Sequence, residues 1–216
     1  MKYPIPDLFP EERHHVVLDH GAALLGGFAL AVADSLITEI QNLSTSSPFR
    51  HMETRGGKTM SVAMFSCGSL GWVSDRSGYR YDPVDPETGK PWPSLPTTFL
   101  ELAGNAAAIT GYPGFVPDAC LVNRYVPGAR LALHQDMDER DRQAPIVSVS
   151  LGLQATFLWG GRARTDKVRR HPLVHGDVVV WGGPSRMFFH GINALKEGEH
   201  PATGAVRYNL TFRKAA

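Results

Sequence analysis

The sequence predicts an α+β fold in which helices cover one face of a jelly-roll-like pair of β-sheets. Helical periodicity comes first along the chain, and short β-branched or aromatic runs separated by glycine-containing turns follow it. A chain of 216 residues that is 43% apolar is also long enough to build one sizeable core. These observations together favour one domain in which helices and strands are segregated.

Composition excludes several classes of protein. The apolar content is too high for a disordered chain, and a net charge of +1 gives no bulk signal for a nucleic-acid or membrane partner. Cys67 and Cys120 lie far apart, so the sequence encodes neither a disulfide framework nor a zinc finger. The first residues do not resemble a signal peptide, and the longest uncharged stretch, 21–33, is too short to cross a bilayer. We therefore expect a cytoplasmic protein without membrane contact.

The first part of the chain predicts an arm, a helix and a cover. About 20 residues form a loose arm, and 28–43 carry apolar residues at helical spacing, although Asp34 and Ser35 leave a later helix start open. Residues 45–96 are rich in Ser, Gly, Pro and aromatic residues. We expect short strands and long loops there, which would form a flexible cover.

A second helix is predicted directly after this cover. Ser94 and Pro96 supply start signals, and Gly111 followed by Pro113 supplies the stop. Its apolar face is expected to comprise Phe99, Leu102, Ala103, Ala106 and Ile109. From residue 118 onward the pattern changes to strands. The predicted strands are 119–126, 130–134, 146–153, 155–159, 172–174, 177–182 and 206–213.

One strand end carries a possible metal motif. His134 and Asp136 are two residues apart, so on an extended chain an imidazole and a carboxylate point the same way. A distant His190 would complete a 2-His-1-carboxylate triad, which leaves positions on iron(II) open. His175 and Asp177 form a competing pair, but the central glycine favours a turn that Asp177 caps. The alternative for His134 and Asp136 is a polar strand end.

The last predicted strand places two arginines on one face. Arg207, Asn209 and Arg213 alternate with Val206, Tyr208, Leu210 and Phe212. Arginines on a covered face require anionic partners, and a small dicarboxylate would satisfy both. Asn123 and Tyr125 share a face of another strand and could donate to carboxylate oxygens. The alternatives are a solvated face for the arginines, a turn-proximal asparagine and a core tyrosine.

Taken together, these motifs resemble the AlkB family of iron(II)/2-oxoglutarate dioxygenases. The resemblance covers about residues 45–213 and is close to the bacterial demethylases that repair alkylated nucleic acid. The specific strings are Asn-Arg-Tyr-Val-Pro-Gly at 123–128, His-Gln-Asp at 134–136 with His190, and Arg-Tyr-Asn-Leu-Thr-Phe-Arg at 207–213.

The resemblance implies one domain over 1–216 with a double-stranded β-helix (jelly-roll) core backed by helices. About 1–44 would form an N-terminal arm and helix, about 45–92 a nucleotide-recognition lid, and about 93–216 a helix and the catalytic core. Iron(II) would be held by His134, Asp136 and His190. The cosubstrate 2-oxoglutarate, used with O2, would be bound by Asn123, Tyr125, Arg207, Asn209 and Arg213.

The resemblance also implies a reaction and its substrate. The enzyme would oxidise N-methyl groups of bases such as 1-methyladenine and 3-methylcytosine, releasing formaldehyde as 2-oxoglutarate and O2 become succinate and CO2. Its partner would be alkylated single- or double-stranded DNA, with RNA as a further substrate, and we expect a monomer. Trp72 and His134 would sandwich the base, Tyr79 would contact the phosphate or the base pocket, and Asp138 would favour a cationic base. Met64 and Ser148 would line the pocket.

Residues 161–171 form the most basic segment of the chain and the best candidate for phosphate contact. Its cations are Arg162, Arg164, Lys167, Arg169 and Arg170. The alternative is a solvated hairpin tip. For the whole chain the alternatives are an iron hydroxylase of protein or small-molecule substrates, a non-catalytic binder and a cupin-like isomerase.

Overall fold

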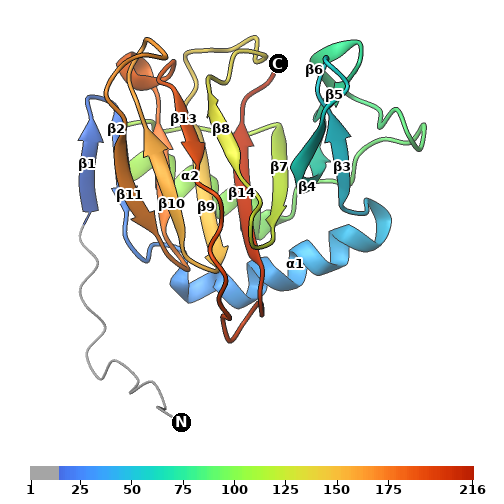
Figure 1. Ribbon diagram of the computed structural model, residues 1–216, viewed down its shortest axis with the longest axis horizontal. Helices are drawn as coiled ribbons and strands as arrows, with labels where there is room; N and C mark the ends of the chain where they lie inside the picture. The colour runs from blue at the N-terminus through green and yellow to red at the C-terminus, as the bar shows by residue number, and fades with distance from the viewer. Residues whose placement is uncertain (1–14) are drawn as a thin grey trace.

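The computed structural model describes residues 15–216, which form two layers of antiparallel strands with two helices packed beneath them (Figure 1). The helices are α1 (Ala33–Ser46) and α2 (Thr97–Ile109), with 3-10 turns at Leu30–Val32 and Gly183–Ser185. Neither helix within 15–216 combines the length and the hydropathy that a membrane crossing would need.

The larger sheet has eight strands, and its centre is the strand that carries the predicted arginines. In spatial order the strands are β1 (His15–Asp19), β2 (Ala22–Leu25), β12 (Val178–Trp181), β9 (Ile146–Gly152), β14 (Arg207–Arg213), β7 (Ala119–Tyr125), β4 (Thr59–Gly68) and β3 (Arg50–Glu53). β14 pairs with β9 on one side and with β7 on the other, so its backbone is held along both edges. This placement makes β14 a rigid base for the side chains that it presents.

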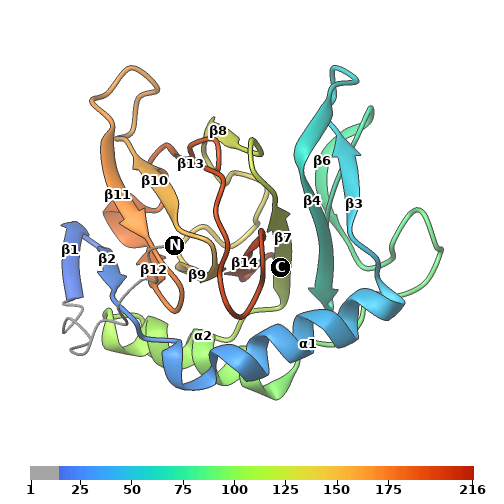
Figure 2. The same ribbon diagram turned by 60° about the horizontal axis from the view of Figure 1, so that its bottom comes forward.

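A smaller sheet faces the large one and carries the predicted metal motif. Its order is β11 (Arg169–Leu173), β10 (Ala155–Trp159), β13 (His190–Ile192) and β8 (Leu131–His134). A separate hairpin consists of β5 (Gly71–Asp75) and β6 (Gly78–Asp82). In Figure 2 the β10–β11 connection and the β3–β6 region rise on opposite sides of β8 and β13.

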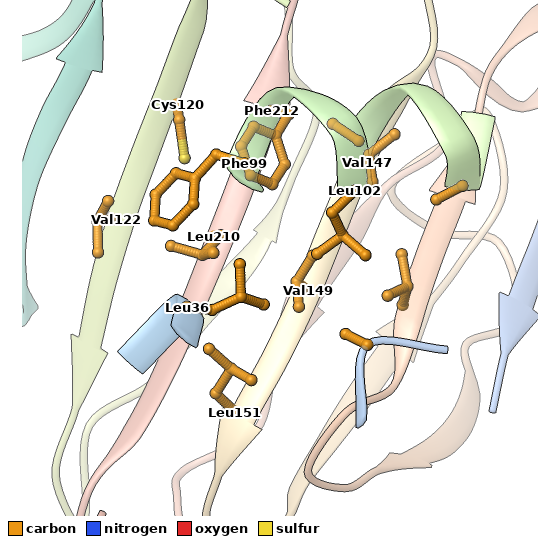
Figure 3. Close-up of a cluster of buried hydrophobic side chains, with 14 of the residues drawn as sticks. Leu36, Phe99, Leu102, Cys120, Val122, Val147, Val149, Leu151, Leu210 and Phe212 are labelled. Carbon is orange, nitrogen blue, oxygen red and sulfur yellow. The ribbon is translucent and has the colours of Figure 1, made fainter. Parts of the chain in front are cut away.

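Two apolar clusters hold these layers together. In the first, Leu36 of α1 and Phe99 of α2 pack against Val122, Leu210 and Phe212 of the large sheet (Figure 3). The second fills the space between the two sheets and includes Trp159 and Trp181. The alternation along β14 therefore separates a hydrophobic outer face under the helices from a polar inner face. That separation confirms the pattern predicted from the sequence.

The helices and the later strands agree with the predictions, apart from details at their ends. Helix α1 starts late, with Asp34 in its first turn, because the preceding residues form a 3-10 turn. The prediction that Ile109 belongs to the buried face of α2 is wrong, since its side chain is 54% exposed at the last turn. Strand β11 begins three residues earlier than predicted, and β13 was not predicted because three residues show no periodicity.

The structure differs more from the predictions in the N-terminal arm and in the cover over 45–96. The arm prediction for 1–14 lies outside the described residues, but from His15 the chain forms the β1–β2 hairpin and extends the large sheet. Within the predicted cover, β4 is a strand of ten residues and β3 pairs with it, so both belong to the large sheet. Within the cover, the β5–β6 hairpin forms its own two-stranded sheet apart from the two main sheets.

Candidate active site

Two histidines from different parts of the chain face each other on adjacent strands of the smaller sheet. His134 ends β8 and His190 begins β13, and the two are register partners whose ring centroids lie 4.4 Å apart. Asp136 follows β8 and places Oδ1 at 3.4 Å from His134 Nε2 and 3.8 Å from His190 Nε2. These are the three residues that sequence spacing proposed as ligands.

The chemistry of the three side chains suits a metal ion. Their ligand atoms lie within 4.8 Å of one another, and they are the cluster of this kind found among the described residues. Nδ1 of His134 is 2.9 Å from the Ala132 carbonyl and Nδ1 of His190 is 3.0 Å from the Phe188 carbonyl. A carbonyl only accepts, so each Nδ1 carries the proton and each Nε2 presents a lone pair toward Asp136. Two imidazoles and one carboxylate match the donor set of non-haem iron(II) oxygenases.

The charge states in this cluster favour metal binding. Burial, with His134 beside it, lowers the pKa of His190 to about 3, so the ring is neutral at physiological pH. Burial alone would raise the pKa of Asp136, but the Arg213 guanidinium and the neighbouring imidazoles hold it well below its usual range. The carboxylate therefore stays ionised although it is buried.

Arg213 holds the carboxylate oxygen that faces away from the imidazoles. Its Nε and Nη2 donate to Asp136 Oδ2 at 2.9 and 2.7 Å. Burial opposes the charge of Arg213, but Asp136, Tyr81 and Glu139 together raise its pKa. Because Oδ2 is occupied in this way, Oδ1 is the oxygen that remains directed toward the metal cluster.

Arg207 occupies the other end of the same face of β14. Its side chain is fully buried, Nη2 donates to Ser150 Oγ at 2.9 Å, and the guanidinium carbon lies 4.9 Å from the centre of the Tyr125 ring. Nε and Nη1 have no hydrogen-bond partner among residues 15–216. Burial lowers the pKa of Arg207. A buried cation with two unused donors is costly, so this position fits a ligand that brings a carboxylate.

The polar residues between the two arginines form one hydrogen-bonded network. Asn123 donates to Asn209 Oδ1 at 3.1 Å, and Thr211 donates to the same oxygen at 2.9 Å. Asn209 in turn donates to Ser148 Oγ at 2.8 Å and to the Val149 carbonyl. The network fixes the amide orientations beside the space where a dicarboxylate would lie.

The residues predicted to handle a base come from the β5–β6 hairpin and the β8 loop. Trp72 and Tyr79 stack with centroids 5.7 Å apart and planes 11° from parallel. Trp72 Nε1 donates to Asp138 Oδ2 at 2.9 Å, so the acidic side chain predicted to receive a base is engaged by the hairpin here. Met64 is buried on β4 opposite Asn123.

The basic segment contacts the rim of the metal cluster. Arg164 donates to the Leu133 carbonyl at 2.8 Å and lies over the Phe189 ring, and Arg162 donates to the Pro184 carbonyl. Arg169 is paired with Asp19 at 2.7 Å. Of these cations, Arg164 contacts residues next to His134 and His190, whereas Arg162 is attached to the 3-10 turn at Gly183–Ser185.

The competing His175–Asp177 pair forms a turn, as predicted. Asp177 accepts from the backbone N–H groups of Val174 and Gly27, and His175 Nδ1 accepts from the N–H of Gly152. Both side chains therefore organise the entry to β12.

Two buried residues next to the cluster, Glu139 and Arg186, and the half-buried Tyr81 were not found from the sequence. Glu139 pairs with Arg186 at 2.9 Å and accepts from the Tyr81 hydroxyl at 2.8 Å. Burial raises the pKa of Tyr81 well above its usual range, so the hydroxyl remains a donor. Glu139 lies in a run of alternating charges that is typical of a solvated loop, and nothing in the local pattern marks it as buried.

Comparison with known proteins agrees with this geometry. Residues 14–213 match the family model described as the 2OG-Fe(II) oxygenase superfamily. The chain is 57% identical over 210 residues to the alpha-ketoglutarate-dependent dioxygenase AlkB of Escherichia coli, covering 97% of each chain. The solved structure of OsALKBH1 superposes with a TM-score of 0.82 and 31% identity, covering 93% of this chain and all of that one.

More distant relatives carry names that specify substrates. A DNA N(6)-methyladenine demethylase of Arabidopsis thaliana, ALKBH1C, is 33% identical and covers 68% of this chain and 38% of its own length. The tRNA demethylase abh1 of Schizosaccharomyces pombe is 31% identical, with 73% and 51% covered.

Proposed function

Since the chain belongs to the AlkB family within the 2OG-Fe(II) oxygenase superfamily and is an iron(II)- and 2-oxoglutarate-dependent dioxygenase, we propose that it removes alkyl groups oxidatively from N-alkylated nucleic-acid bases. The bases would be of the 1-methyladenine and 3-methylcytosine type, in single- or double-stranded DNA and also in RNA. The supporting observation is the inner face of β14. There Arg213 holds the metal-ligand carboxylate, and Arg207 presents two unused buried donors.

The roles of the metal and cosubstrate residues follow from their contacts. His134, Asp136 and His190 would hold iron(II) through two Nε2 atoms and Oδ1. When bound, iron(II) supplies the activation of O2 that oxidises 2-oxoglutarate to succinate and CO2 and converts the N-methyl group to formaldehyde. Arg207 would pair with one carboxylate of 2-oxoglutarate, which would end its isolation as a buried charge. Arg213 would help to bind the other carboxylate of 2-oxoglutarate.

The polar network and its neighbours would complete the cosubstrate pocket. Asn123, Tyr125 and Asn209 border the space beside Arg207. The hydrogen bond from Asn123 to Asn209 orients the two amides, and the Tyr125 ring lies against the Arg207 guanidinium. Because both flanking strands hold β14, these groups are positioned before the cosubstrate arrives.

The hairpin residues would act on the base. A base inside a duplex must be flipped out of the stack to reach a buried metal site, and it then needs flat surfaces to lie against. Trp72 and Tyr79 already stack on each other, and Trp72 with the His134 ring would hold the base between them. Asp138 would exchange its bond with Trp72 for one with the base, and its charge favours a cationic alkylated base over a neutral one. Arg164 would contact a flanking phosphate, while Met64 and Ser148 line the pocket.

A single assay tests the proposal. A synthetic oligonucleotide carrying 1-methyladenine or 3-methylcytosine is incubated with the protein, ferrous iron, 2-oxoglutarate and air, and its mass is followed. We expect the loss of one CH2 per methyl group, the release of formaldehyde and succinate in equal amounts, and no loss with His134→Ala. Consumption of 2-oxoglutarate without any mass loss from methylated DNA or RNA would instead favour a hydroxylase of protein or small-molecule substrates.

A further inference from the structure

Two residues that face each other across the β5–β6 hairpin contact two consecutive acidic residues of the β8 loop. Trp72 and Tyr81 are register partners, so their side chains lie on the same face of the hairpin. Trp72 donates to Asp138 and Tyr81 donates to Glu139, at 2.9 and 2.8 Å. The hairpin is therefore attached to this loop at two adjacent points.

The two attachments differ in burial. Asp138 is exposed, so water or a ligand can replace Trp72 as its partner. The Glu139 side chain is only 2% exposed and that of Tyr81 is half-buried, so breaking their hydrogen bond would leave a buried acceptor short of a partner. The first contact can open during a reaction cycle, whereas the second is suited to persist.

Glu139 also connects the hairpin to the metal cluster. Its Oε1 lies 3.2 Å from Arg213 Nε, and Arg213 holds Asp136. Its Oε2 accepts from Arg186, which also donates to the Asp136 backbone carbonyl at 2.9 Å. One buried carboxylate thus shares two buried guanidinium groups with the metal-ligand aspartate.

The balance of charge in this group depends on Glu139. With Glu139 present, two buried anions, Asp136 and Glu139, face two buried cations, Arg186 and Arg213. Without its charge, Arg213 would be compensated by Asp136 alone, and a cation held tightly by that carboxylate competes with a metal ion for it.

We propose that Glu139 is a positioning residue that ties the substrate-binding hairpin, through Tyr81, to the metal-ligand carboxylate, through Arg213. The substrate side of this inference rests on the proposed function, whereas its metal side does not. The connection holds the β5–β6 hairpin, and with it Trp72, in a fixed position relative to the metal site while the hydrogen bond between Trp72 and Asp138 opens and closes. It also keeps Arg213 from drawing Asp136 away from the metal.

The test compares Tyr81→Phe, Glu139→Met and their combination. Tyr112→Phe is the matched control, because Tyr112 also donates one 2.8 Å hydrogen bond, to the Gly21 carbonyl, outside the site. Hydrogen–deuterium exchange of residues 71–82 in the metal-free protein reports on the hairpin. Titration with Co²⁺ reports on the metal site, and KM and kcat for a methylated oligonucleotide report on the reaction. Thermal unfolding of each variant checks that it is folded.

We expect Tyr81→Phe to speed exchange in 71–82 and to raise the oligonucleotide KM several-fold, with kcat and Co²⁺ affinity within twofold of the wild type. Glu139→Met, which removes both the charge and the oxygen that accepts from Tyr81, should show the same hairpin effects and should also weaken Co²⁺ binding several-fold. Adding Tyr81→Phe to Glu139→Met should produce no further rise in KM, because both changes break the same connection.

The proposal is overturned if Tyr81→Phe exchanges like Tyr112→Phe, or if folded Glu139→Met binds Co²⁺ like the wild type. Additive KM effects in the double variant would overturn it as well. Exchange and Co²⁺ binding are measured without nucleic acid, so a wild-type protein that failed to demethylate would refute the proposed function and leave these two readouts to decide the role of Glu139.

Discussion

Arg213 donates both of its hydrogen bonds with Asp136 to the same oxygen, Oδ2, and leaves Oδ1 facing His134 and His190. One oxygen of the carboxylate is therefore bound to a permanent cation, and the other is directed toward the place where a metal ion would bind. This arrangement keeps the aspartate ionised and also fixes which of its oxygens can coordinate.

Arg213→Ala should destabilise the metal-free protein, because it leaves Asp136 and Glu139 buried without their shared cation. The cost expected for breaking a buried pair is about 3–5 kcal/mol, measurable by urea unfolding. In the loaded enzyme the same variant should require more 2-oxoglutarate for half-maximal rate. An unchanged requirement would place the cosubstrate carboxylate elsewhere.

Arg207→Met should have the opposite effect on stability. Arg207 is buried with two unused donors, so an apolar side chain of similar length should leave the metal-free protein as stable or more stable, by about 1–2 kcal/mol. The same change should abolish the rise in melting temperature that 2-oxoglutarate gives the wild type. Arg186→Met is the matched control, because Arg186 is paired with Glu139 and its loss should be destabilising. Equal destabilisation by both variants would refute the assignment of Arg207.

Gly191→Ala should disturb the metal site through the backbone. A Cβ at this position would lie 2.6 Å from the Leu131 carbonyl oxygen, so β13 and β8 would have to separate. The two histidines are register partners on these strands, and we expect Co²⁺ affinity to fall by about tenfold or more, as overpacking forces backbone shifts. Gly56→Ala, where a Cβ has no contact closer than 4.0 Å, should bind Co²⁺ normally.

Asp85→Asn should make the protein less stable at neutral pH and less sensitive to acid. Asp85 accepts from Arg50 at 2.7 and 2.8 Å. Burial would raise the pKa of Asp85, but these bonds hold it below its ordinary value of 3.8. A lowered folded pKa contributes stability above the unfolded value that is lost as pH falls through the folded one. We expect urea unfolding to show a deficit of about 2 kcal/mol at neutral pH that shrinks in acid. If the loss of stability in Asp85→Asn did not depend on pH, the ion pair between Asp85 and Arg50 would not be its cause.

The double variant Arg162→Ala, Arg164→Ala should weaken the salt dependence of DNA binding. Each lost phosphate contact lowers the slope of log K against log salt by about 0.7 for single strands and 0.9 for duplex. Arg169→Ala is the control, because Arg169 is already paired with Asp19. A slope unchanged in the double variant would exclude Arg162 and Arg164 from phosphate contact.

The sequence predicted the parts of this protein whose side chains repeat with a clear period. β14 is the best example, since alternation alone separated Arg207, Asn209 and Arg213 from the apolar outer face. β13 and the β1–β2 hairpin were missed because three to five residues are too short for a period to be distinguished from chance. The cover was overestimated because β4 carries Ser, Met and Cys where a typical strand has β-branched residues.

Within the site, individual residues were predictable but their partners were not. His134, Asp136 and His190 could be grouped from ligand chemistry, and the structure brings them together. The bond between Trp72 and Asp138 joins segments 66 residues apart, and no local pattern encodes such a contact. Glu139 could not be recognised because burial depends on which strands surround it, and its neighbours in sequence are charged.

The central position of β14 in the large sheet also constrains the order of assembly during translation. β7 and β9 both precede β14 in the chain, and each uses it as a neighbour. Until β14 has been synthesised and can pair, β7 and β9 each lack one strand neighbour, which leaves a gap in the large sheet. The nascent chain must keep that gap from pairing with another polypeptide, and the site cannot form until its last guanidinium arrives.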